Sequence, residues 1–352
     1  MVSRSQRLEF ELTPACDHRC AHCYNVWVDS AGRRVAPVLD TADYCALIDK
    51  ALNESGATHA TLTGGEPLLR SDAELIVERA CGAARSVSVV TNGSHMGPAR
   101  ARRLAALGVK WVQLSLLSHR RERHDSLKGA RSFDDTLRAA LDLQDAGVAV
   151  QLCYVALLTN AGDFEGVIEL AAALGVRALA YNRMSPSGGA AAHIARLLPT
   201  ARQMERDLEI AERLGPALNL RVATAMPIPP CLVPLARFPS VRFGFCSVGT
   251  EKAGFVVGAQ GDVRACNLSS RILGNALNEN FAAIMARAET ALFRRRVPAM
   301  CRGCAHEAIC AGGCKEAAVA VYGDPTVPEP ILRDTIEPGW RELIRDERGG
   351  RS

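Results

Sequence analysis

Three cysteines near the N-terminus constrain this chain more than any other feature of its sequence. They have the spacing C-x3-C-x2-C and directly follow a predicted strand over residues 8–12: Cys16, Cys20 and Cys23. Soft thiolate ligands select iron–sulfur clusters or zinc, and three thiolates on a four-iron cube leave one iron without a protein ligand. An open metal position is typical of a catalytic site. The alternative is a structural zinc site that His18 or His22 completes.

The rest of the N-terminal region alternates between short β-branched runs and stretches with helical apolar spacing. We predict strands over residues 8–12, 60–63, 86–91, 109–116, 148–157, 177–183 and 218–225, and helices over 41–55, 72–82, 98–107, 133–146, 163–174 and 200–214. Such alternation is typical of βαβ units around a parallel sheet. We therefore expect an α/β fold, a partial (β/α)6 TIM-like barrel that carries its chemistry at the C-terminal ends of the strands.

The alternation stops near residue 225, and five prolines fall between residues 227 and 239. Seven of the 13 cysteines follow residue 226. We predict a barrel over residues 1–226, a small cysteine-rich C-terminal iron–sulfur domain over 227–335 and a polar tail over 336–352. A region so small and rich in loops needs bound metal to supplement its apolar core.

Charge and hydropathy exclude several classes of function. The formal net charge is only +4 and no basic patch is interleaved with aromatics, so we expect no nucleic-acid partner. The N-terminus lacks the apolar segment of a secretory signal, and the longest apolar run, 148–158, is too short to cross a membrane. We therefore expect a cytoplasmic protein with no membrane partner. In that reducing compartment the cysteines serve as metal ligands, catalytic groups or core residues rather than disulfides.

A second cysteine set with regular spacing lies in the C-terminal region. Cys246 and Cys266 flank Gly261, and a C-x2-C-x5-C-x3-C run follows at Cys301, Cys304, Cys310 and Cys314. Gly261 fits a tight turn between predicted strands over 255–257 and 263–265. The C-x2-C pair places two thiolates on one metal, whereas Cys310 and Cys314 can point to different sites. A zinc ribbon is the alternative to iron–sulfur clusters.

The N-terminal cysteine loop resembles the signature of the radical S-adenosylmethionine (SAM) superfamily, although His22 stands where the family usually has an aromatic residue. The resemblance implies that the open iron of a 4Fe–4S cluster binds the amino and carboxylate groups of SAM. One electron from the reduced cluster would then cleave the sulfonium to methionine and a 5′-deoxyadenosyl radical, which abstracts hydrogen from the substrate. A reductant such as a flavodoxin or ferredoxin is the implied electron source.

Further motifs resemble the family's SAM-binding elements at the ends of predicted strands. Gly64-Gly65-Glu66 resembles the motif that holds the methionyl amine, and Thr91-Asn92-Gly93 resembles an element near SAM. By the same resemblance, Ser115 would contact the ribose or carboxylate of SAM, and Asn182 would contact SAM or the substrate. Cys153 on the fifth predicted strand could donate a hydrogen atom in a radical epimerisation, whereas Cys45 and Cys81 fit core positions.

The C-terminal half resembles the SPASM extension, which carries auxiliary 4Fe–4S clusters. The family pattern implies one cluster on Cys246, Cys266 and Cys314 and a second on Cys301, Cys304 and Cys310, so we expect one or two auxiliary clusters. The family's last cysteine is missing, which leaves the second cluster with an oxygen or nitrogen ligand, with an open iron, or absent. The nearby carboxylates are Asp324, Glu329 and Asp334. Cys231, in the linker, is expected as a fourth ligand of the first auxiliary cluster.

These resemblances imply a radical SAM/SPASM enzyme that oxidatively modifies a ribosomally made precursor peptide, by a crosslink, an epimerisation or a similar change. One alternative is an enzyme for a small-molecule substrate such as a tetrapyrrole, a sugar or an antibiotic precursor. The other is a non-catalytic iron–sulfur electron carrier, which would not need Gly64-Gly65-Glu66 or an open iron. Residues 1–7 are too few for a leader-binding domain, so we expect a separate leader-peptide recognition protein or direct docking of the leader.

Overall fold

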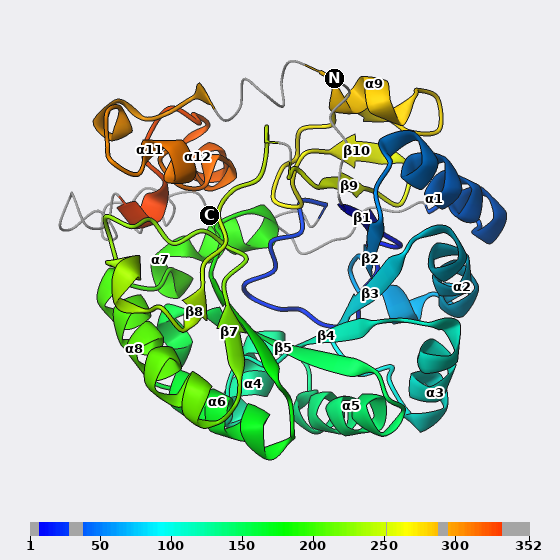
Figure 1. Ribbon diagram of the computed structural model, residues 1–352, viewed down its shortest axis with the longest axis horizontal. Helices are drawn as coiled ribbons and strands as arrows, with labels where there is room; N and C mark the ends of the chain where they lie inside the picture. Colours follow the sequence, from blue (N-terminus) through cyan, green and yellow to red (C-terminus); the bar gives the residue numbers. More distant parts are fainter. Residues whose placement is uncertain (1–6, 28–37, 251, 288–294, 333–352) are drawn as a thin grey trace, which may run out of the picture.

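The computed structural model describes residues 7–27, 38–250, 252–287 and 295–332. In this part of the chain, eleven strands form one sheet in the order β11-β10-β9-β1-β2-β3-β4-β5-β6-β7-β8. The strands from β1 to β8 are all parallel: β1 (Arg7–Glu11), β2 (His59–Thr63), β3 (Ser86–Thr91), β4 (Trp111–Ser115), β5 (Ala149–Ala156), β6 (Ala178–Arg183), β7 (Arg221–Ala223) and β8 (Val241–Arg242). The sheet curls into a barrel (Figure 1), and the barrel is only partial because the end strands β11 and β8 do not pair within the described residues.

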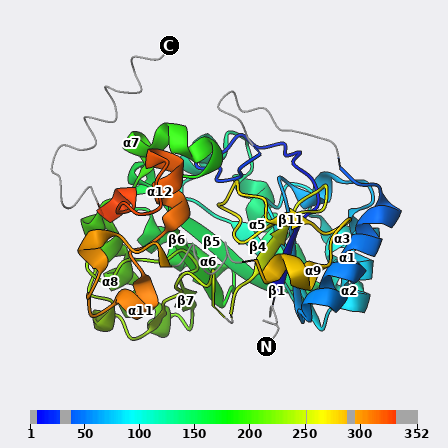
Figure 2. The same cartoon turned by 90° about the horizontal axis from the view of Figure 1, so that it is seen from above.

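Helices cover the outer face of the curled sheet (Figures 1 and 2). They are α1 (Thr41–Ser55), α2 (Ala73–Ala83), α3 (Pro98–Leu107), α4 (Arg121–Lys128), α5 (Phe133–Asp145), α6 (Phe164–Ala173), α7 (Ile194–Leu197) and α8 (Ala201–Ala217). Short 3-10 helices are η1 (Pro67–Leu69), η2 (Leu158–Asn160), η3 (Gly188–His193), η4 (Leu235–Arg237) and η5 (Ala299–Cys301). The predicted α/β partial barrel is confirmed, with α4 and α7 as additional helices.

Helix boundaries follow from local capping chemistry. The Asp40 carboxylate accepts the Asp43 amide at 2.9 Å and begins α1, and Gly56, in the left-handed region at φ 68°, ends it. The Thr200 hydroxyl accepts the Gln203 amide at 3.1 Å and begins α8 in the same way. These caps are among the positions at which the sequence predicts the helices to start and stop.

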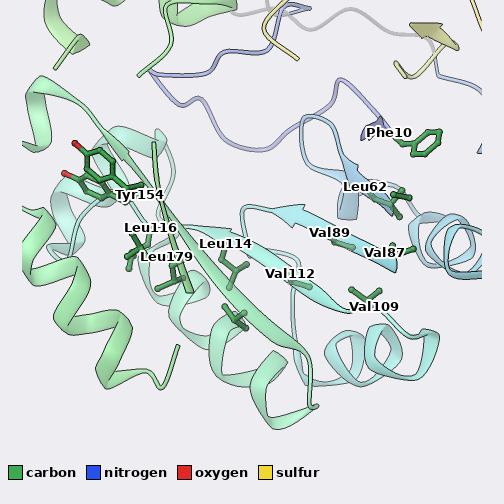
Figure 3. Close-up of a cluster of buried hydrophobic side chains, with 14 of the residues drawn as sticks. Phe10, Leu62, Val87, Val89, Val109, Val112, Leu114, Leu116, Tyr154 and Leu179 are labelled. Atoms are coloured by element: carbon green, nitrogen blue, oxygen red, sulfur yellow. The ribbon is translucent and has the colours of Figure 1, made fainter. Parts of the chain in front are cut away.

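An apolar layer lies between the sheet and the helices. Register places Phe10 beside Leu62, Leu62 beside Val89, and Val89 beside Val112, and all four side chains are buried (Figure 3). Because side chains alternate between the two faces of a strand, residues such as Glu11 lie on the opposite face. The outer face therefore carries the core, and the inner face is left for polar side chains.

The C-terminal region extends the same sheet. Strand β9 (Phe255–Val257) pairs in parallel with β1, and β10 (Asp262–Arg264) returns antiparallel to it through a turn at Gly261, as the sequence predicts. The remaining elements are β11 (Gly274–Asn275), α9 (Phe281–Met285), α11 (Glu307–Cys310) and α12 (Lys315–Tyr322). Helices α11 and α12 lie on the side where the sheet stays open (Figure 1). Sheet pairing therefore crosses the predicted domain boundary at residue 226.

Among the helices that the structure describes, none combines the length and apolar character that a membrane crossing requires. The predicted tail over residues 336–352 and the carboxylate of Asp334 lie outside the described residues.

Candidate active site

The loop with the three predicted cluster cysteines follows β1 and runs across the ring of strands (Figure 1). Its first residues are bonded to the turn after β2. The amide of Gly65 donates to the carbonyl oxygen of Thr13, and the amide of Glu66 donates to that of Ala15, each at 2.7 Å. The Gly-Gly-Glu motif and the cysteine loop are therefore one hydrogen-bonded unit.

Two glycines allow this close approach. A Cβ atom on Gly65 would lie 2.1 Å from the carbonyl oxygen of Ala15, and one on Gly64 would lie 2.5 Å from that of Thr13. Gly64 also has a φ of 144°, a backbone angle that residues other than glycine rarely adopt. The sequence predicts that these glycines approach a ligand closely. In the structure they approach the backbone of the cysteine loop.

The middle of the loop is held by the C-terminal end of α4. The amide of Arg19 donates to the carbonyl oxygen of Lys128 at 3.1 Å, and that of Ala21 donates to Leu127 at 3.3 Å. Gly129 ends α4 at φ 61°, and a Cβ there would lie 2.7 Å from the carbonyl oxygen of Arg19. Helix α4, which the apolar pattern does not predict, thus helps to place the three thiols.

The thiol chemistry of the loop fits an iron–sulfur cluster. Burial raises the pKa of Cys23 to about 11 and also raises the pKa of Cys20, so both thiols keep their protons at neutral pH until a metal replaces them. Burial lowers the pKa of His18 to about 4 and that of His22 to about 3, so both rings are neutral. Across the described ranges, no three His, Cys, Asp or Glu side chains converge on a single ion position. The thiols that hold a 4Fe–4S cluster each bind a different iron, so they lie farther apart than the ligands of a single metal ion.

The predicted SAM and substrate contacts lie at the C-terminal ends of neighbouring strands. Gly64-Gly65-Glu66 follows β2, Thr91-Asn92-Gly93 ends β3, Ser115 ends β4, Cys153 lies on β5 and Asn182 lies near the end of β6. Register pairs Ser115 with Cys153, and the amide nitrogen of Asn182 donates to the Cys153 sulfur at 3.5 Å. Burial raises the pKa of Cys153 to about 11, which keeps it in the thiol form. The side-chain oxygen of Asn182 accepts the backbone amides of Ala225 and Met226 and so anchors the start of the linker.

The carboxylate of Glu66 joins two of these strand ends. One oxygen accepts the Thr91 hydroxyl at 2.7 Å and the Leu68 amide at 3.0 Å, and the other accepts the Asn92 amide at 2.7 Å. Burial raises the pKa of Glu66. The Asn92 side chain in turn donates to Asp17 on the cysteine loop at 2.8 Å. These bonds give Glu66 a positioning role, and its predicted contact with the methionyl amine stays a prediction.

The cysteines of the C-terminal region separate into two sets. The first set is Cys246, Cys266 and Cys314, the grouping that the SPASM resemblance implies. Burial, with a smaller contribution from the charge of Cys246, raises the pKa of Cys266 to about 12. Burial also raises the pKa of Cys314, and the charge of Cys266 adds to that increase. Cys266 follows β10 and Cys314 precedes α12, so two separate elements supply these thiols.

The second set is Cys301, Cys304 and Cys310, again the grouping that the SPASM resemblance implies. Burial and then the charges of Cys310, Cys301 and Cys304 raise the pKa of Cys231. The expectation that Cys231 joins the first set stays a prediction.

The carboxylates proposed as replacement ligands are already bonded elsewhere. Glu329 is buried and accepts two hydrogen bonds from Arg183, at 2.6 and 2.8 Å, and one from the Cys314 amide at 3.1 Å. Asp324 accepts the hydroxyl and the amide of Thr326 at 2.7 Å, in an exposed turn. Neither carboxylate therefore supports the predicted return to the second cluster.

A buried lysine lies between the two thiol sets. Burial lowers the pKa of Lys315, whereas the charges of Glu329, Cys301, Cys246 and Cys310 raise it. Thiols of both sets therefore act on the pKa of Lys315, whose amine donates a hydrogen bond to the carbonyl oxygen of Ala311. Sequence reasoning missed this residue because a lysine directly after a cysteine carries no distinctive pattern.

A cavity of about 490 Å³ opens beside the cysteine loop. Ala21 of that loop lines it, together with Arg120, Arg123 and Arg196. Asp163 neutralises part of this charge, since its carboxylate lies 3.0 Å from the Arg123 guanidinium. Glu122 also lines the cavity, so its wall is of mixed charge with arginines in excess, next to the predicted reaction centre.

The curled parallel sheet, with a three-thiol loop at its strand ends, defines an α/β iron–sulfur enzyme. A model described as the radical SAM superfamily matches residues 10–171. The mycofactocin maturase MftC of Mycobacterium tuberculosis is 31% identical over 319 residues, which cover 88% of this chain and 78% of that protein. The PqqA peptide cyclase of Ruegeria pomeroyi is 29% identical over 330 residues, which cover 91% and 85%. The chain belongs to the radical SAM superfamily.

Solved structures share this fold. SuiB of Streptococcus suis bound to its precursor peptide SuiA has a TM-score of 0.74 at 16% identity, covering 93% of this chain and 75% of that chain. The structure of anSMEcpe with bound AdoMet has a TM-score of 0.70 at 16% identity, covering 98% of this chain and all of that one. These solved structures show the fold, and membership in the radical SAM superfamily gives this enzyme SAM and an iron–sulfur cluster as its cofactors.

Proposed function

We propose that this enzyme oxidatively modifies a precursor peptide, forming a crosslink or a similar new bond. The carrying observation is the likeness, along most of both chains, to a protein named peptide cyclase and to a second named maturase. The fold shared with a protein solved with its precursor peptide supports the same substrate class. A peptide needs a site that opens to solvent at the strand ends, where the cysteine loop of this chain lies.

In this proposal the thiols of Cys16, Cys20 and Cys23 hold the cluster that binds SAM. When bound, the two cofactors supply a 5′-deoxyadenosyl radical that takes one hydrogen atom from the substrate. The residues of the chain fix the geometry: Gly65 and Glu66 hold the loop by their amides, and the Glu66 carboxylate locks the ends of β2 and β3 together. Positioning of this kind matters because misplacement by about 1 Å can cost about 100-fold in rate.

The oxidation must remove a second electron and a proton from the substrate. We propose that this electron passes to a cluster held by the auxiliary thiol sets, whose charges act on the pKa of the nearby Lys315. A flavodoxin or ferredoxin would supply the electron that starts each turnover. The basic cavity beside Ala21 would receive acidic side chains of the peptide or of its leader.

A second candidate outcome is epimerisation, which one observation favours. Cys153 lies on the inner strand face at the level of Ser115, with a pKa of about 11 that keeps its hydrogen in place. A thiol there could return a hydrogen atom to a substrate radical, and the thiyl radical left on Cys153 would regain its hydrogen as one electron from the reductant and one proton from solvent. Crosslinking removes two hydrogen atoms from the peptide, whereas epimerisation leaves its mass unchanged, so mass spectrometry separates the two.

The test uses the reconstituted enzyme with SAM, a reductant and any short peptide that is encoded beside its gene. We expect one peptide to lose the mass of two hydrogen atoms as 5′-deoxyadenosine accumulates. A Cys153→Ala variant should keep this activity if the product is a crosslink. Turnover of a free metabolite, with none of the peptides altered, would contradict the proposal and favour the small-molecule alternative.

A further inference from the structure

The cavity beside the cysteine loop holds one more positive charge than its neighbours offset. We propose that this cavity binds a single carboxylate, that of an acidic residue in the precursor peptide near the residue that is modified. The inference deepens the proposed function and rests on it, because it needs a peptide as the substrate. It names the group that the enzyme recognises on that peptide and makes Arg196 the residue that recognises it.

Four separate segments form the cavity. Ala21 comes from the cysteine loop, Leu127 from α4, Thr159 from η2 and Leu197 from α7. The amide of Ala21 donates to the carbonyl oxygen of Leu127 at 3.3 Å, which ties the loop to α4 at the cavity wall. The volume of about 490 Å³ lies within the range of about 300–1,000 Å³ that is typical of small-ligand sites. The cavity is therefore large enough for an acidic side chain and its adjoining backbone.

The charges around the cavity do not balance. Arg120, Arg123, Arg196 and Glu122 line it. The buried carboxylate of Asp163 lies 3.0 Å from the Arg123 guanidinium and 3.8 Å from that of Arg120, so two arginines share one acid. Three positive charges thus meet two negative ones, which leaves an excess of one. A site with this charge is complementary to one carboxylate.

Arg196 supplies the unbalanced charge. It is exposed on α7, and across the described residues no carboxylate forms an ion pair with it. A guanidinium presents its N–H donors in a planar fork that fits both oxygens of a carboxylate. Within a cavity such a pair is partly shielded from water, so it is stronger than an ion pair on an open surface.

The cavity lies close to the predicted reaction centre. Ala21 is next to Cys20 and two residues before Cys23, so its Cα atom lies within about 8 Å of those of both cysteines. An extended peptide advances about 3.3 Å per residue. An acidic residue bound here therefore belongs to the segment of the peptide around the modified residue, rather than to a leader many residues away.

Arginine footprinting of the wild-type holoenzyme with a defined probe tests the cavity. The probe is the capped tripeptide acetyl-Gly-Glu-Gly-amide, and its Gln analogue is the matched uncharged peptide. The Glu peptide should halve the rate at which phenylglyoxal modifies Arg196 at an about tenfold lower concentration than the Gln peptide, a difference of about 1.4 kcal/mol. Arg102, exposed on α3 outside the cavity, is the control, and its modification should not distinguish the two peptides. Equal protection of Arg196 by both peptides would overturn the inference.

Kinetics with the peptide that the enzyme modifies separate this inference from the proposed function. An Arg196→Gln variant should raise KM for that peptide about tenfold and leave kcat unchanged, because the contact binds the ground state and the transition state alike. Replacing the acidic residue of the peptide by its amide should do the same to the wild-type enzyme and add nothing in the variant. An Arg102→Gln variant should keep the wild-type KM.

The two failures differ in outcome. Modification of the peptide by the Arg196→Gln variant at an unchanged KM would refute the inference and leave the proposed function intact. Selective protection of Arg196 by the Glu probe, in an enzyme that alters no peptide, would uphold the carboxylate site while the proposed function fails.

Discussion

Replacing Gly65 by alanine should drive a methyl carbon into the backbone of the cysteine loop. The new Cβ would lie 2.1 Å from the carbonyl oxygen of Ala15, and Cβ atoms are essentially never found closer than 3.0 Å to such an atom. The loop must therefore withdraw by about 0.9 Å, the difference between those two distances. That shift stretches two hydrogen bonds of 2.7 Å, from Gly65 to Thr13 and from Glu66 to Ala15, past bonding distance. At about 1 kcal/mol for each bond, the loop is loosened by about 2 kcal/mol.

The assay is the rate of 5′-deoxyadenosine formation by the Gly65→Ala enzyme, which we expect to fall about 100-fold because Cys16 is displaced by nearly 1 Å. The matched control is Gly82→Ala on helix α2, where a Cβ would meet no atom within 4 Å. That change should keep the wild-type rate and stabilise the helix by about 0.5–1 kcal/mol. A Gly65→Ala enzyme that cleaves SAM at the wild-type rate would refute the claim that the Gly-Gly-Glu turn positions the cysteine loop.

Three further predictions concern charges. A Lys315→Met variant removes the cation between the thiol sets, so a redox titration should find the auxiliary potentials lowered by on the order of 100 mV, equivalent to on the order of 2 kcal/mol. An Arg183→Met variant leaves Glu329 buried and unpaired and should lose about 3–5 kcal/mol of unfolding free energy. The Arg183→Met/Glu329→Gln double variant should regain much of that loss. Equal losses in the two variants would contradict the pairing argument. Burial raises the pKa of Asp207, which Tyr181 contacts, from 3.8 to about 7. The folded state then holds the proton more tightly than the unfolded chain, so denaturation midpoints should fall as pH rises from about 4 to about 7, and Asp207→Asn should flatten that slope.

Local patterns predicted most of the barrel. Strand periodicity and caps such as Asp40 and Gly56 depend on neighbours within a few residues, so they are visible in the sequence. Helix α4 was not predicted, because its polar sequence has no apolar stripe and it buries only His124, Leu127 and Lys128. The joining of β8 to β7 was not foreseen either, since a two-residue strand has no periodicity to detect.

In the candidate site, too, local features could be predicted from the sequence and long-range contacts could not. The spacing of Cys16, Cys20 and Cys23 is local, and the resemblance identified it directly. The Arg183–Glu329 pair joins residues 146 positions apart, and only the folded chain brings them together. The assignment of Cys231 stays a prediction, because its place along the chain says nothing about which thiols it faces once the linker folds.

The most direct test of the account is SAM cleavage by an enzyme that lacks only the first thiol set. Wild-type protein, reconstituted under anaerobic conditions with SAM and dithionite, should form 5′-deoxyadenosine. The Cys16→Ala/Cys20→Ala/Cys23→Ala variant should form none while keeping about 4 irons for each auxiliary cluster that the wild-type protein holds, because the auxiliary sets remain. Deoxyadenosine at the wild-type rate from this variant, or none from fully loaded wild-type protein, would contradict the account.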